Sequence, residues 1–255
     1  MTDFEQEIKR IEPVVRGLSN LALVGKKMMV SGRENFIPSG PNIIVGNHIG
    51  TFKDIAILFK IVPRPIFFTA NKMLFNRKEF NLLIKKHFRR HLKNFGPAAD
   101  VLLSPIKSLV INYVSSHIIR VGTIPVDLTG KKRFAMATCQ DYLKKGRAII
   151  ALQGRGRVMN KSRHPYVDSF RRGVAVMAYN VFQEEGIRVP VTPMAIFGTQ
   201  IPFFIPAKVK INVGKPMYIT DYLAEGFTES VDNFRYALEK RVKELFRETI
   251  LKMPS

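Results

Sequence analysis

A histidine and an aspartate at the end of a short apolar run are the residues of this chain best suited to acid–base chemistry. His48 follows Asn47 and the apolar run from Pro41 to Gly46, and Asp54 comes six positions later, as a helical pattern begins. An imidazole can take a proton from an alcohol near neutral pH, while a carboxylate on its other nitrogen fixes the tautomer and stabilises the cation. The spacing indicates a His–Asp dyad, although a turn histidine beside a helix-capping aspartate explains this pair alone more simply.

A turn rich in glycine and arginine suggests a second kind of chemistry, the binding of an anion. The turn is Gln153-Gly154-Arg155-Gly156-Arg157, and it directly follows an apolar run. Glycines let the backbone approach an anion, and guanidinium groups bind phosphate through paired hydrogen bonds. Taken alone, such a turn is more often simply solvated.

The charge of the whole chain indicates an anionic partner. Lys and Arg number 41 against 20 Asp and Glu, which gives a formal net charge of +21 over 255 residues. Nucleic acid and an anionic membrane surface both suit such a charge, but no RNA-recognition, zinc-finger or helix-turn-helix signature argues for nucleic acid. The single cysteine, Cys139, excludes a multi-cysteine zinc site. His87 and His91 stand four apart without a third ligand in view, so we predict no metal site.

The first 35 residues form a candidate membrane anchor. Apolar residues recur at helical spacing from Phe4 to Leu18, basic residues lie on other faces, and more apolar residues follow from Leu21 to Val30. A basic amphipathic helix is typical of an interfacial anchor, and a terminal helix packed on the body is an equal alternative. We expect no signal peptide, because the basic-then-apolar pattern is missing, and no apolar stretch of about 20 residues spans a bilayer. These features predict monotopic association with the cytoplasmic face of a membrane.

Short apolar runs alternate with helical patterns along the remainder of the chain. Strands are expected at 41–46, 66–68, 147–152, 189–196 and 209–213, and helices near 51–60, 78–94, 131–145, 171–185 and 231–246. This alternation predicts an α/β fold with a mixed, largely parallel sheet flanked by helices. The expected organisation is an N-terminal amphipathic helical segment, residues 1–35, followed by one domain, residues 36–255.

Taken in order, these motifs resemble the lysophospholipid acyltransferase family, which includes 1-acyl-glycerol-3-phosphate acyltransferase. The family blocks are Asn-His-x4-Asp, Gly-x-Ile/Phe-x-Ile-Asp-Arg, Pro-Glu-Gly-Thr-Arg, Phe-Lys-x-Gly and Val-Pro-Ile-x-Pro. Their counterparts here are residues 47–54, 122–127, 152–157, 170–173 and 189–193. The resemblance covers roughly residues 40 to 217, and the order and spacing of the blocks make it specific.

The resemblance implies an acyltransferase that moves a fatty acyl group from a thioester to a hydroxyl of a lysophospholipid or related glycerolipid. The thioester donor is acyl-CoA or acyl carrier protein, and no other cofactor is implied. His48 is the implied general base and Asp54 its orienting partner. The residues implied to bind substrate are Asn47, Gln153, Gly154, Arg155, Arg157 and Arg172.

The chain departs from the family pattern at several positions. Its dyad is His-x5-Asp, one residue longer, so the extra residue must be absorbed around Ile49-Gly50 before the helix starts. Leu128 and Gly156 stand where the family has arginine, and Gln153 replaces glutamate. These departures leave two alternatives open, a catalytically weak lipid-binding relative and an acyltransferase for an amine-bearing or glycan lipid. The net charge of +21 leaves a third, a basic nucleic-acid-binding protein.

Overall fold

The computed structural model describes most of the chain in two compact units. The described residues are 13, 15–17, 19–20, 22–50, 52–92, 104–105, 108, 111–112, 123–126, 133–154, 166–201 and 205–251. The smaller unit comprises Met1–Ile11 and Phe68–Ala135, and the larger comprises Glu12–Phe67 and Met136–Ser255. The expected domain boundary at residue 35 falls within the larger unit. Every residue of the dyad and its surroundings belongs to that larger unit.

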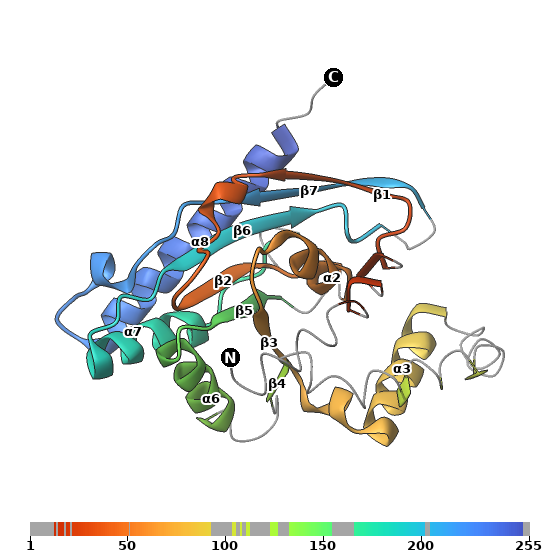
Figure 1. Ribbon diagram of the computed structural model, residues 1–255, viewed down its shortest axis with the longest axis horizontal. Coiled ribbons are helices and arrows are strands. Elements are labelled where there is room, and N and C mark those ends of the chain that lie inside the picture. Colours follow the sequence, from red (N-terminus) through yellow and green to blue (C-terminus); the bar gives the residue numbers. More distant parts are fainter. Residues whose placement is uncertain are drawn as a thin grey trace. The chain divides into compact units, whose positions relative to one another are not determined.

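A seven-stranded sheet in the order β1-β7-β6-β2-β5-β3-β4 organises the fold. Its strands are β1 (Lys26–Ser31), β2 (Asn42–Asn47), β3 (Ile66–Asn71), β4 (Thr123–Val126), β5 (Ala148–Gln153), β6 (Val191–Phe197) and β7 (Ala207–Val213). In the larger unit β1, β7, β6, β2 and β5 lie side by side (Figure 1), and all their pairings are parallel except that of β6 with β7. In the smaller unit, residues 68–71 of β3 pair in parallel with β4. The expected mixed, largely parallel sheet is confirmed.

The central strand β2 delivers the dyad to one edge of the sheet. All six of its residues are buried, as expected for an apolar strand covered on both faces. Its parallel register pairs Asn47 with Gln153, the last residue of β5. Because β2, β5 and β6 run the same way, their carboxyl ends meet at one edge, where open α/β sheets bind their ligands.

Helices follow or cover these strands. They are α2 (Phe52–Ile61), α3 (Arg77–Leu92), α6 (Arg133–Lys144), α7 (Gly173–Glu185) and α8 (Phe227–Leu251), with short 3-10 helices at Arg33–Asn35, Lys72–Phe75 and Ile219–Tyr222. The longest helix, α8, packs along β6 and β7 (Figure 1) and buries the apolar face that the sequence predicts, including Phe234, Leu238 and Phe246. The five expected helices and five expected strands are all present.

The N-terminal segment differs from its expected structure. Described residues between Pro13 and Ala22 are helical, but Lys26–Ser31 form the edge strand β1, paired in parallel with β7. The expectation of a helical segment over residues 1–35 is therefore wrong at Lys26–Ser31. Gly25 and Gly32, with φ of 71° and 73°, bracket the strand, and a left-handed glycine is a usual end of a helix. Residues 1–12 of the expected anchor lie outside the described residues, and no described helix is long and apolar enough to cross a membrane.

Candidate active site

His48 and Asp54 touch at the carboxyl end of β2. The distance from His48 Nδ1 to Asp54 Oδ2 is 2.9 Å, and the His48 side chain is 25% exposed while that of Asp54 is fully buried. The helix α2 begins only at Phe52, so the extra residue of the His-x5-Asp spacing lies in the loop before it. The same Asp54 oxygen accepts the backbone N–H groups of Ile49 at 2.9 Å and Gly50 at 2.8 Å. The carboxylate thus shapes the loop that carries the histidine.

This contact assigns the two nitrogens of the imidazole different tasks. A carboxylate accepts hydrogen bonds but has no hydrogen to donate. Nδ1 of His48 therefore carries the hydrogen of the bond that it donates to Asp54. In the neutral ring Nε2 is then the basic nitrogen. The partial exposure of His48 leaves the ring open to an incoming molecule, whereas Asp54 has no exposure at all. The pair has the geometry of a general base and its orienting carboxylate.

Asn47 holds the strand end from which His48 departs. It is fully buried, and its amide nitrogen donates to the carbonyls of Ile196 at 2.9 Å and Tyr166 at 3.1 Å. Its oxygen accepts the N–H of Ile196 at 2.8 Å. Asn47, predicted to bind substrate, therefore has its amide bonded to backbone on neighbouring segments.

Gln153 and Gly154 lie beside the dyad, as the register of β2 and β5 requires. Gln153 is buried, and its side-chain oxygen accepts the backbone N–H of Arg171 at 3.1 Å. Gly154 has a φ of 115°, and a Cβ there would come within 3.3 Å of the His48 carbonyl oxygen. The structure thus brings together Asn47, His48, Gln153 and Gly154, while Arg155 and Arg157 lie outside the described residues.

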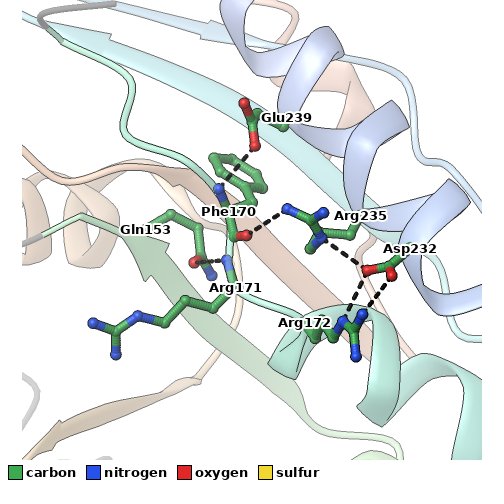
Figure 2. Close-up of polar contacts among 7 residues, drawn as sticks. All are labelled: Gln153, Phe170, Arg171, Arg172, Asp232, Arg235 and Glu239. Atoms are coloured by element: carbon green, nitrogen blue, oxygen red, sulfur yellow. Dashed lines mark hydrogen bonds and ion pairs between the residues drawn. The ribbon is translucent and has the colours of Figure 1, made fainter. Parts of the chain in front are cut away.

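Arg172 is engaged in an ion-pair network with α8 (Figure 2). Its Nε and Nη2 donate to the two oxygens of Asp232 at 2.8 and 2.5 Å. Hydrogen bonding to Arg172 lowers the pKa of Asp232, and the same bond raises the pKa of Arg172. Arg235 also donates to Asp232 and to the carbonyl of Phe170, while Glu239 accepts the N–H of Phe170 at 2.9 Å. Arg172, predicted to bind the anion, already has a carboxylate partner.

Arg171 points the opposite way, beside Gln153 (Figure 2). It is exposed, and no acidic side chain among the described residues pairs with it. The second position of the Phe-Lys-x-Gly block corresponds to Arg171, and this is the signal by which the sequence indicates it. Arg171, the neighbour of the residue that we expected, therefore lies beside Gln153 without an acidic partner in the described part of the chain.

Two further buried residues lie where the start of α2 meets the turn after β6, and the sequence motifs do not indicate either role. Lys53 is buried and donates through Nζ to the carbonyl of Ile201 at 2.6 Å. Burial lowers the pKa of Lys53, with Lys26 acting in the same direction and Asp54 opposing it. Thr199, in the same turn, is fully buried. The turn is thereby attached to the first turn of α2, one residue from the dyad carboxylate.

The remaining candidate groups lie apart from this arrangement. Cys139, on α6, is buried, and burial raises the pKa of its thiol to about 12. A thiol that keeps its proton is a poor nucleophile. Among the described residues, no group of three or more His, Cys, Asp or Glu side chains is placed to hold a metal ion, and the side chains of His87 and His91 lie outside the described part.

No family model matches the chain, and neither does any curated protein. Among solved structures, the crystal structure of the 1-acyl-sn-glycerophosphate (LPA) acyltransferase PlsC from Thermotoga maritima is similar, with a TM-score of 0.58 and 20% identity over 100% of this chain and 85% of that one. The chain has the fold of that acyltransferase. At this identity the likeness shows the fold alone.

Proposed function

We propose that the chain is an acyltransferase that moves a fatty acyl group from a thioester to a hydroxyl of an anionic lysolipid. The observation that carries the proposal is the contact between the buried Asp54 carboxylate and Nδ1 of the partly exposed His48. It lies at the carboxyl edge of the sheet, in a fold shared with an LPA acyltransferase. The family resemblance of the ordered sequence blocks supports the same reaction.

In the proposed reaction Nε2 of His48 removes the proton from the acceptor hydroxyl as its oxygen attacks the thioester carbonyl. The carbon–oxygen bond forms and the carbon–sulfur bond breaks. The departing thiolate then takes up the proton that the imidazolium carries. Asp54 stabilises that imidazolium through its bond to Nδ1. No covalent acyl-enzyme is needed, so the buried Cys139 has no part in the chemistry.

The anionic group of the acceptor would meet the cations around the Gln153 loop. Arg171 supports this part of the proposal, because it lies beside Gln153 and has no acidic partner in the described part of the chain. Arg155 and Arg157 remain predicted ligands of the same group. Gln153 stands where the family has glutamate and binds the Arg171 backbone, and this substitution keeps amine-bearing and glycan lipids among the acceptors to be tested.

Association with an anionic membrane surface belongs to the same proposal. The net charge of +21 supports it, since each basic residue near such a surface contributes about 1 kcal/mol of attraction. A peripheral, monotopic attachment at the cytoplasmic face would bring the site to its lipid acceptor and its acyl-CoA or acyl carrier protein donor.

A donor–acceptor screen with the purified chain in detergent tests the proposal. Acyl-CoA and acyl carrier protein thioesters would be paired with lysophosphatidic acid, lysophosphatidylcholine, an amine-bearing lysolipid and a glycolipid. We expect acyl transfer to an anionic lysolipid that falls by about 10²–10⁴-fold in His48→Ala, the contribution of a general base. Cys139→Ala, which removes a buried thiol on α6, is the control and should keep the wild-type rate. Equal rates for wild type and His48→Ala across all pairs would refute the proposed function.

A further inference from the structure

Two buried oxygen atoms beside the dyad lack hydrogen-bond partners among the described residues. They are Oδ1 of Asp54, the carboxylate oxygen that does not meet His48, and Oγ1 of Thr199. Both residues are fully buried. Native proteins rarely leave buried polar atoms unpaired, because each then loses its hydrogen bonds to water without replacement. Each of the two atoms therefore calls for a partner, and the structure places no hydrogen bond between them.

The surroundings of Gly50 show that the two oxygen atoms lie near one position, the place that a Cβ on Gly50 would occupy. A Cβ on Gly50 would overlap the Thr199 side chain and would lie 2.7 Å from Asp54 Oδ1. Both oxygens therefore approach the Cα of Gly50 from the side where another residue would carry its side chain. Glycine at this position leaves room for the threonine hydroxyl to approach the carboxylate.

The chemistry of the two atoms is complementary. Oδ2 of Asp54 already accepts from His48 Nδ1 and from two backbone N–H groups, whereas Oδ1 is an acceptor in need of a donor. A hydroxyl is a donor whose hydrogen rotates freely about its bond. The turn after β6 places this donor opposite the start of α2, and Lys53 ties α2 to the same turn through the carbonyl of Ile201.

We propose that Thr199 is a positioning residue whose hydroxyl donates to Asp54 Oδ1, directly or through one water molecule. The bond prevents rotation of the carboxylate, so Oδ2 stays aligned with Nδ1 of His48 and Nε2 stays the basic nitrogen. The catalytic part of this inference rests on the proposed function. The effect on His48 itself does not, because the alignment exists without any substrate.

Three variants test the role of the hydroxyl. Thr199→Val keeps the shape and removes the donor, Thr199→Ser keeps the donor, and Thr192→Val is the matched control. Thr192 is equally buried on β6, but its hydroxyl bonds Asn42 instead of the dyad. Thermal unfolding monitors folding, and Thr199→Ala replaces Thr199→Val if the valine variant does not fold.

The first measurement is the proton NMR resonance of His48 Nδ1–H, assigned by its absence in His48→Gln, and the second is acyl-transfer kinetics. We expect Thr199→Val to shift or broaden the resonance and to lower kcat by about tenfold with KM within twofold. Thr199→Ser and Thr192→Val should match wild type in both. If Thr199→Val alters the resonance but the wild-type protein shows no acyl transfer, the Thr199 bond is supported and the proposed function is refuted. An unchanged resonance in Thr199→Val, or an equal defect in Thr199→Ser, would overturn the inference.

Discussion

The Asn47 side chain bonds to both backbone groups of Ile196, donating to its carbonyl at 2.9 Å and accepting from its N–H at 2.8 Å. The parallel register of β2 and β6 ends one residue earlier, at Gly46 and Met194. The amide thus extends the connection between the two strands after the ladder itself has stopped. His48 departs from a strand end that is fixed on the β6 side by this bond and on the β5 side by the pairing of Asn47 with Gln153.

Asn47→Ala should therefore impair both folding and catalysis. It leaves the Ile196 N–H and carbonyl without the amide, and a buried polar group left unsatisfied costs about 1–3 kcal/mol. Urea unfolding should show a loss of about that size, and kcat should fall because His48 is no longer held. Asn42→Ala is the control, since Asn42 is buried on the same strand but bonds Thr192. Full kcat in a folded Asn47→Ala protein would contradict the positioning role.

Sequence spacing located the dyad because the relevant contacts are local. His48 and Asp54 are joined by one loop that begins at a strand end recognisable from its apolar run. The partners of the other site residues are distant in sequence: Arg172 pairs with Asp232, 60 positions away, on the exposed face of α8. Nothing in the stretch around Arg172 indicates that carboxylate, so sequence spacing alone does not separate Arg172 from Arg171.

The strand β1 shows that pairing between distant segments also limits how much of the fold the sequence predicts. Lys26–Ser31 has too few alternating apolar and polar residues to distinguish a half-buried edge strand from the end of an amphipathic helix. Its partner β7 lies about 180 positions along the chain in the register Lys26 to Ala207. Gly25 is the local signal that a helix stops before this segment, and Gly32 follows the last residue of the strand. The buried strands β2, β5 and β6 were predictable because their apolar runs are continuous.

Substitution of the two adjacent arginines should affect different properties, acceptor binding for Arg171 and stability for Arg172. Arg171→Gln should raise KM for the anionic acceptor by about 10–100-fold, because a lost charge-assisted hydrogen bond is worth about 1.5–3 kcal/mol, and should weaken the salt dependence of binding. Arg172→Gln should leave KM within twofold and lower the unfolding free energy only slightly, because solvent screens an exposed ion pair. Initial rates at several ionic strengths and urea unfolding measure both effects. A larger KM change in Arg172→Gln than in Arg171→Gln would assign the anion to Arg172.

Cys139 provides a prediction that depends on pH. Burial raises the pKa of its thiol from 9.0 to about 12, so between these values the folded chain keeps a proton that the unfolded chain releases. The unfolding free energy should therefore decrease as pH rises above 9, by at most about 1.4 kcal/mol per pH unit from this group. Below pH 9 both states hold the proton, and Cys139 contributes no slope.

Urea unfolding of wild type and Cys139→Ala at pH 8, 9 and 10 isolates this contribution, because lysine and tyrosine titrations are common to both proteins. We expect the stability of wild type to fall more steeply with pH than that of the variant. A thiol reagent should label Cys139 at pH 8 only after unfolding, since a buried protonated thiol is unreactive. Cys139→Ala should also retain acyl transfer. Its loss, in a protein that still unfolds cooperatively, would mean that the thiol takes part in the chemistry and that the reaction proposed for His48 and Asp54 is incomplete.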